Sequence, residues 1–255
     1  MRFAAWTLTA LLFAAGAASA SDDMTIVSKN ILNGKPSGNT TNYLSGDHAR
    51  MEQSGGHATI IDLKTDTMTT LDLVKKTYYT VTKKDMEELN AKMKERMNTP
   101  EAKKGMEAMK GMADGMAASY EVKKTGETRR VGSFTCEEWV ITMNAMSTMK
   151  ECVTGEVKYP AHAFEAFRSF GESMRASSPF ASMAKSGESL GEKMKAIKGF
   201  PVATAMTIDV MGNKSTTETE VVEISHSSIP ASTWEVPTGY TKIENPMMKA
   251  FDHHR

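Results

Sequence analysis

The spacing of hydrophobic residues divides the chain into strand-like and helix-like segments. From residue 24 to residue 83, apolar and polar positions alternate, as at Thr59, Ile61 and Leu63. A period of two, interrupted by short polar turns, predicts an antiparallel meander of strands. The same alternation predicts further strands at residues 120–124, 131–143, 202–210 and 217–224.

Two regions have helical spacing instead. The first has Asp85 as its expected N-cap, and its apolar residues are Met86, Leu89, Met93 and Met97. Thr99 and Pro100 are expected to start another helix, whose stripe consists of Met106, Met109, Met112 and Met116. These two helices make up the first region, so the pattern predicts a helical insertion near residues 85–118. The second region predicts another helical insertion near residues 160–198.

Methionine dominates these stripes, and the chain contains 21 of them. Residues 91–118 contain no Leu, Ile, Val or Phe. Three interpretations remain open. Methionine replaces leucine in an ordinary core, or it lines an adaptable apolar cavity for a lipid or lipidated partner, because its flexible side chain repacks readily. In the third, the thioethers of Met109, Met112 and Met116 bind copper(I), a soft metal. The candidate cavity residues are Met93, Met97, Met106, Met109, Met112, Met116, Trp139, Phe164 and Phe167.

The N-terminus resembles a secretory signal peptide. A basic start at Arg2 is followed by an apolar run and by the small residues Ala18, Ser19 and Ala20. The run is too short for a comfortable membrane span. We therefore expect cleavage after Ala20 and a periplasmic or secreted protein that is not an integral membrane protein.

Charge excludes one class of partner. The chain has 31 basic and 31 acidic residues. Nucleic-acid binding requires a concentrated positive field, so no nucleic-acid partner is expected.

The two cysteines, Cys136 and Cys152, are expected to form a disulfide in an oxidising compartment. A hairpin turning near Asn144 would place them opposite each other. On the chain-entropy estimate such a link stabilises by roughly 3 kcal/mol.

Catalytic signatures are absent from the sequence. It contains no GxSxG, HExxH, GxGxxG or P-loop motif. The adjacent pair His253 and His254 lies at a terminus, where the chain is expected to be mobile. A binding role is therefore favoured over an enzyme, and no cofactor is expected.

Several segments resemble a family of secreted bacterial domains of unknown function, of the type numbered 4412. They are Gly199-Phe200-Pro201, the segment from Ile229 to Tyr240, the stretch LDLVKKTYYTVTKKDM from Leu71 to Met86, and the two cysteines. The resemblance implies a fold like that of the outer-membrane lipoprotein carriers, with an open antiparallel half-barrel whose concave face is covered by helices. The C-terminal Trp234, Val236 and Tyr240 are expected to plug one edge of the sheet.

The prediction is thus an α+β half-barrel with one domain over residues 21–245 and a mobile tail over 246–255. The expected function is non-enzymatic binding of an apolar ligand, lipid or lipoprotein in a methionine-rich cavity. Periplasmic copper binding is the alternative, and a hydrolase without a recognisable motif is a further one. The oligomeric state stays open.

Overall fold

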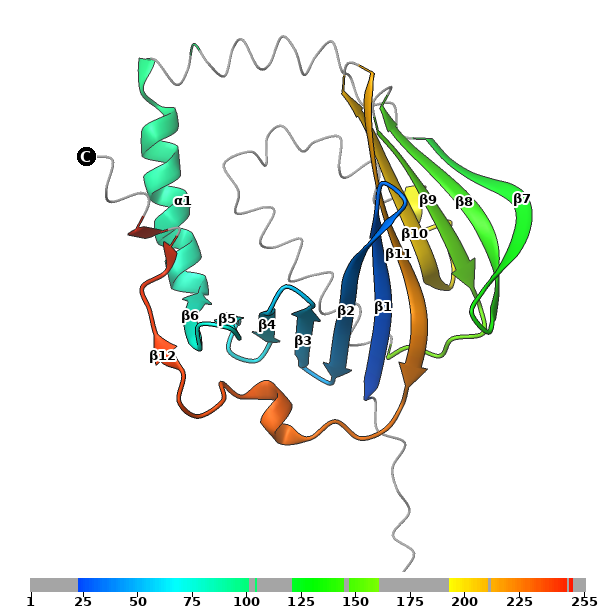
Figure 1. Ribbon diagram of the computed structural model, residues 1–255. Helices are drawn as coiled ribbons and strands as arrows, with labels where there is room; N and C mark the ends of the chain where they lie inside the picture. Colours follow the sequence, from blue (N-terminus) through cyan, green and yellow to red (C-terminus); the bar gives the residue numbers. More distant parts are fainter. Residues whose placement is uncertain are drawn as a thin grey trace, which may run out of the picture.

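The computed structural model describes residues 23–100, 104, 121–144, 147–160, 193–210, 212–246, 248 and 249. Its strands form one sheet in the order β12-β6-β5-β4-β3-β2-β1-β11-β10-β9-β8-β7. Figure 1 shows this sheet as an open, curved wall with β12 and β7 at its two ends. All neighbouring pairs are antiparallel except β12 and β6, which run parallel.

Strand length separates the sheet into two halves. The long-strand half consists of β1 (Met24–Leu32), β2 (Lys35–Ser45), β7 (Glu121–Val131), β8 (Phe134–Asn144), β9 (Ser147–Thr154), β10 (Phe200–Val210) and β11 (Asn213–Ser225). The short-strand half consists of β3 (His48–Gln53), β4 (His57–Asp62), β5 (Thr67–Asp72), β6 (Thr77–Thr82) and β12 (Thr241–Lys242). The meander predicted for residues 24–83 is confirmed as β1 to β6.

The predicted α+β class, with helices covering the concave face, is wrong. The described chain is mostly strand; its one α-helix with defined bounds is α1 (Lys83–Met97), and a short 3-10 helix, η1 (Ala231–Trp234), lies in the C-terminal region. This helix follows directly from β6 and stands at that end of the sheet, away from the long strands (Figure 1). Helical periodicity reveals an apolar stripe but not the surface on which the stripe packs. The open, curved sheet itself is compatible with a half-barrel.

The helix α1 begins one turn earlier than its predicted cap. Thr82 and Asp85 form a reciprocal capping box: the backbone N–H of Thr82 donates to Asp85 Oδ2 at 2.7 Å, and the backbone N–H of Asp85 donates to Thr82 Oγ1 at 3.2 Å. The bond from Thr82 N–H is the main reason that the pKa of Asp85 is lowered. Thr82 is therefore the N-cap. Of the described helices, none is long and apolar enough to cross a membrane.

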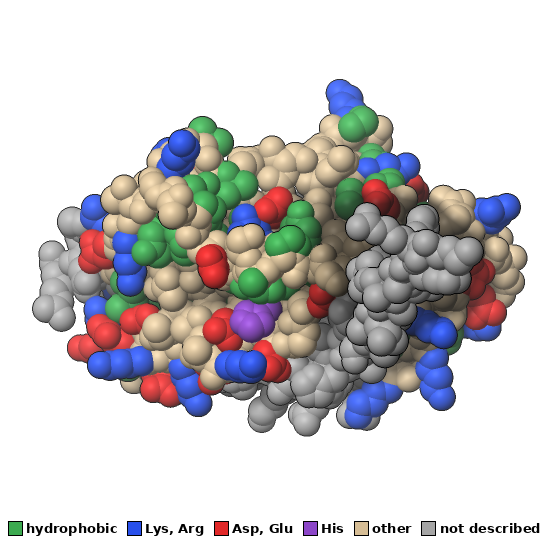
Figure 2. Space-filling view, turned by 90° about the horizontal axis from the view of Figure 1, so that it is seen from below, with side chains coloured by type: hydrophobic (Ala, Val, Ile, Leu, Met, Phe, Trp, Pro, Cys, Tyr) green, Lys and Arg blue, Asp and Glu red, His purple; other side chains and the backbone are tan. Residues whose placement is uncertain are grey.

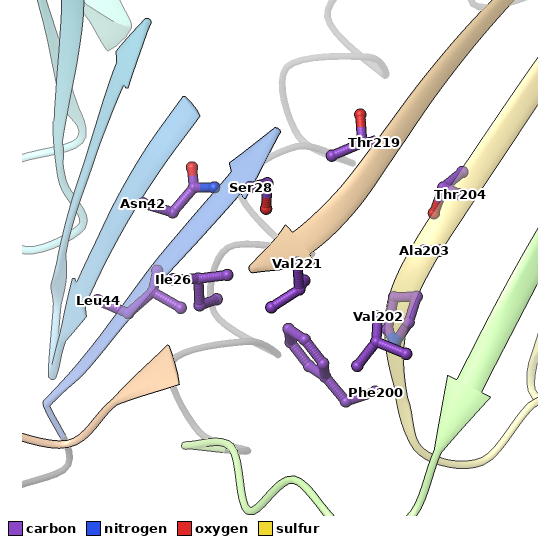
Figure 3. A pocket seen from close by; sticks show the side chains of 11 residues that line it. Ile26, Ser28, Asn42, Leu44, Phe200, Val202, Ala203, Thr204, Thr219 and Val221 are labelled. Carbon is purple, nitrogen blue, oxygen red and sulfur yellow. The ribbon is translucent and has the colours of Figure 1, made fainter. Parts of the chain in front are cut away.

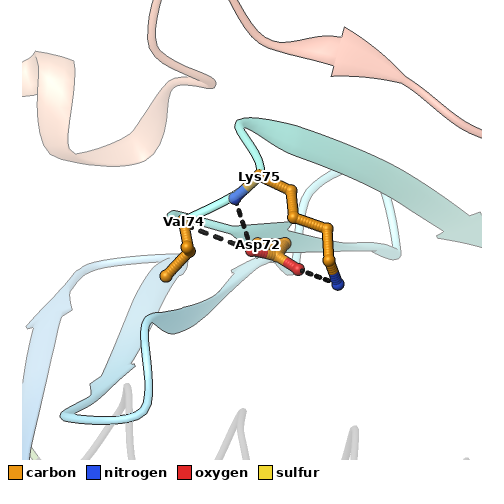
Figure 4. A network of polar contacts seen from close by, with 3 residues as sticks. All are labelled: Asp72, Val74 and Lys75. Carbon is orange, nitrogen blue, oxygen red and sulfur yellow. Dashed lines mark hydrogen bonds and ion pairs between the residues drawn. The ribbon is translucent and has the colours of Figure 1, made fainter.

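Tight turns join the short strands. In the turn between β5 and β6, Asp72 Oδ1 accepts the backbone N–H groups of Val74 at 3.1 Å and Lys75 at 2.8 Å, as Figure 4 shows. The Lys75 ammonium lies 3.0 Å from Asp72 Oδ2. These hydrogen bonds, with that to Lys75 N–H the largest contribution, lower the pKa of Asp72. The aspartate thus fixes the hairpin by a local side-chain turn.

Each half has its own hydrophobic core. The long-strand half contains the larger cluster, formed by Met24, Ile26, Leu44, Val131, Cys136, Cys152, Val157, Phe200, Val202, Ala203 and Val221. In the short-strand half the buried cluster is only Ala58, Ile60 and Leu71. Val236 and Tyr240 from the C-terminal region pack against this smaller cluster.

A C-terminal strap, residues 226–240, leads from β11 along one end of the sheet to β12 (Figure 1). Trp234 stacks on His48 with ring centroids 5.5 Å apart, and the buried Arg50 donates to the Thr233 carbonyl at 3.0 Å. Viewed onto this end, hydrophobic side chains gather with charged ones around them (Figure 2). The contacts of Trp234, Val236 and Tyr240 are with β3 and with the cluster of β4 and β5, which are interior strands. The strap therefore covers one end of the short-strand half, and the prediction that it plugs an edge of the sheet is wrong.

The disulfide between Cys136 and Cys152 is confirmed, with Cα atoms 5.3 Å apart. The predicted register is wrong by two residues, because Cys152 pairs with Glu138 across the β8–β9 ladder. The bond therefore runs diagonally between the strands. A register irregularity between Thr142 and Asn144, near the turn, accompanies this offset.

Candidate functional site

The described structure contains a cavity of about 300 Å³ in the long-strand half. Its apolar lining consists of Ile26, Leu44, Phe200, Pro201, Val202, Ala203 and Val221, and its polar lining of Ser28, Asn42, Thr204 and Thr219. Figure 3 shows side chains from four strands, β2, β1, β11 and β10, arranged around this common space. The volume is at the lower end of the range for small-molecule sites.

Two β-bulges shape the cavity wall. The β1–β11 register shifts between Val27 and Ser28, and the β10–β9 register shifts between Pro201 and Ala203. Ser28, Pro201 and Ala203 all line the cavity. Bulges bend a strand and redirect its side chains, and they allow proline inside a sheet. Two of the register irregularities of this half therefore lie in the wall of the cavity.

A polar row crosses the sheet at one side of the cavity. Thr204 pairs with Thr219, which pairs with Asn30, so these three side chains share one face. Thr219 Oγ1 donates to Asn30 Oδ1 at 3.2 Å, and Asn30 Nδ2 donates to Thr40 Oγ1 at 2.8 Å. The cavity is therefore amphipathic, with an apolar body and one hydrogen-bonded polar border.

Glu151 extends this row onto β9. It pairs with Thr204 on one side and with Trp139 on the other, so it lies on the cavity face. The residue is only 9% exposed, and burial raises the pKa of its carboxyl. Glu151 is not among the residues predicted from the sequence. The sequence does carry a signal for it: Glu151 alternates with Met149 and Val153, so an acidic residue occupies an inward position of the strand.

The predicted cavity residues are not the ones that line this hollow in the described structure. Trp139 lies on the same face, two strands from β10, and is half-buried. Met93 is half-buried on α1, and the side chain of Met97 lies outside the described part. The other predicted residues, Met106, Met109, Met112, Met116, Phe164 and Phe167, also lie outside the described residues, so their roles stay predictions.

The alternative metal site also stays a prediction, because Met109, Met112 and Met116 are its ligands. Within the described residues, no group of three or more His, Cys, Asp or Glu side chains is placed to hold a metal ion. The terminal pair His253 and His254 lies outside the described part of the chain.

The sequence profile of the family described as Domain of unknown function (DUF4412) matches residues 23–240. The chain belongs to this family. The matched range includes every strand except β12 and includes the strap. No curated protein matches the chain at a significant level.

Solved structures give distant similarities only. PNGF-II, in two crystal forms, has 11% sequence identity and a TM-score of 0.37, over 91% of this chain and 33% of its own. MucB in complex with MucA(peri) has 9% identity and a TM-score of 0.34, over 85% of this chain and 54% of its own. The chain thus spans about a third of PNGF-II and about half of MucB. Such low scores support no conclusion about function.

Proposed function

We propose that this protein is an exported, non-enzymatic binding protein that holds an apolar ligand, or the lipid group of a partner, in the cavity of the long-strand half. The observation that carries the proposal is the cavity of about 300 Å³ with its mainly aliphatic lining. Burying apolar surface stabilises by about 25 cal/mol per Å², so an apolar chain gains most where the walls are hydrocarbon.

Export is supported by two features. The first twenty residues have the pattern of a cleaved signal, and both cysteines of the chain are joined in a disulfide. Disulfides persist chiefly in oxidising compartments outside the cytosol. Export and the cavity together support a ligand-binding role in the cell envelope.

A cavity-filling substitution tests the function. Thr204→Phe places an aromatic ring beside Val202 and Thr219, whereas Thr207→Phe on the same strand lies on the opposite face and is the matched control. Wild type is expected to bind the neutral apolar probe N-phenyl-1-naphthylamine saturably, measured by fluorescence. Affinity should fall at least tenfold in Thr204→Phe and stay unchanged in Thr207→Phe.

Protein purified from its own envelope provides the complementary test. Native mass spectrometry and lipid extraction are expected to find a bound apolar molecule that Thr204→Phe lacks. A folded wild-type protein that neither carries such a molecule nor binds the probe saturably would overturn the proposal. Equal weakening by both phenylalanine substitutions would also overturn it.

A further inference from the structure

Glu151 is buried on the strand next to the cavity lining, and no partner for its carboxyl group is found in the described part of the chain. The residue is 91% buried, since its exposed fraction is 9%. Within the described residues no hydrogen bond or ion pair to Glu151 is found, although buried acidic groups are normally paired. No fully enclosed side-chain oxygen in this part of the chain lacks a partner. The Glu151 oxygens therefore keep a small opening through which another group can reach them.

The neighbours of Glu151 on this face are apolar or neutral. Thr204 and Trp139 flank it on the adjacent strands, and Met149 and Val153 flank it along β9. Lys124, opposite Trp139, is the nearest basic residue in the described register, but its ammonium lies 2.6 Å from Glu137 Oε2. The carboxylate is thus desolvated and uncompensated, which explains why the pKa of Glu151 is raised.

The position of Glu151 relative to the cavity suits a ligand that has an apolar part and a polar head. Adjacent strands lie about 4.8 Å apart, so Glu151 is one strand spacing beyond Thr204, a lining residue. A molecule with its apolar part among Phe200, Val202 and Val221 can extend a polar head by that distance along the row. Trp139, opposite Glu151 on β8, is an aromatic residue, and aromatic rings attract cations.

We infer that Glu151 recognises the cationic head of an amphiphile, an alkylammonium group, whose apolar tail occupies the cavity. This inference rests on the proposed function and names its ligand class. An ammonium group would supply the missing ion-pair partner where the local dielectric is low and the Coulomb attraction is strong. A carboxylate head would meet repulsion at the same place.

Three twelve-carbon ligands that differ only in the head group test the inference. Dodecylammonium, dodecanol and dodecanoate are titrated, below their micelle concentrations, against bound N-phenyl-1-naphthylamine. Wild type is expected to bind dodecylammonium at least tenfold more tightly than dodecanol and dodecanoate least tightly. Glu151→Gln should remove the preference for dodecylammonium while leaving dodecanol affinity within twofold. Glu223→Gln, at an exposed glutamate of β11, is the matched control and should retain the preference.

The outcomes separate the two proposals. If dodecanol binds but dodecylammonium is not preferred, or if the preference survives in Glu151→Gln, the inference about Glu151 is wrong and the apolar site remains. If neither the probe nor any of the three ligands binds folded protein, the proposed function is wrong as well. Circular dichroism of each variant shows that the protein tested is folded.

Discussion

The two halves of the sheet are held together in different ways. The long-strand half has a large core and a disulfide, yet bulges in its strands shape a cavity, and the buried Glu151 has no partner among the described residues. In the short-strand half, β3 to β6 are regular six-residue strands with a buried cluster of only three apolar residues, and the C-terminal strap packs against this cluster. The register irregularities thus lie in the half that has the larger core and the disulfide. Strained or under-packed positions persist only when their surroundings compensate for them.

The largest loss of stability is expected from a substitution at the centre of the smaller core. Leu71 is fully buried, so Leu71→Ala should destabilise the protein by about 3–4 kcal/mol through lost burial and a residual cavity. Hydrogen exchange should show β3 to β6 opening before β1, β2 and β11. The half-exposed Leu32 provides the control, because Leu32→Ala should change stability by less than about 0.5 kcal/mol. Equal loss of protection in all strands would mean that the halves form one cooperative unit.

Removal of the disulfide should act on the other half. Replacement of both Cys136 and Cys152 by Ala is expected to lower the free energy of unfolding by roughly 3 kcal/mol, with exchange increasing first in β8, β9 and β10. Denaturant titration measures the change, and reduced wild type should match the variant. If β4 and β5 lose protection from exchange as early as β9, the two halves do not unfold independently.

The strap should contribute less. Trp234→Ala removes the ring stacked on His48 and is expected to cost about 2 kcal/mol, because the ring is only half-buried. Trp234→Phe should restore most of the loss. The amide of Thr241, which donates to the Lys76 carbonyl at 2.9 Å, should exchange faster in the alanine variant alone. An unchanged amide would show that β12 holds the edge without the strap.

The smallest predicted change in stability is a gain, caused by substitution of Glu151. Because burial raises the pKa of Glu151 in the folded protein, its protonated form is favoured, and this stabilisation is lost as pH rises through the raised pKa. At pH 7 without ligand, Glu151→Gln should therefore be more stable than wild type by about 1 kcal/mol, the lower end for an unpaired buried polar group. The difference should vanish as pH falls below the usual glutamate value of 4.5. Urea titrations at both pH values measure it, and a variant less stable at pH 7 would contradict the assignment.

Local signals in the sequence predicted much of the fold. The alternation at Thr59, Ile61 and Leu63 predicted the meander, and the strand pair at 202–210 and 217–224 is observed as β10 and β11. The two cysteines alone predicted their bond. These features depend on period, turns and composition, which adjacent residues determine.

The cavity could not be predicted in the same way. It forms because β1 lies between β2 and β11, a pairing that brings Ile26 near Val221 and has no local signature. The two-residue offset at Cys152 accompanies an irregularity near the hairpin turn, and the helix is capped by Thr82 instead of the predicted Asp85. Such outcomes depend on tertiary contacts and on small energy differences between neighbouring residues.

The middle of the sheet joins segments synthesised far apart in time. Thr25 pairs with Ser225, two hundred positions later, so the first strand must wait without its inner neighbour until nearly the whole polypeptide has been made. Such distant pairing slows folding and delays closure of the hollow. No product that ends before β11 can therefore complete the sheet.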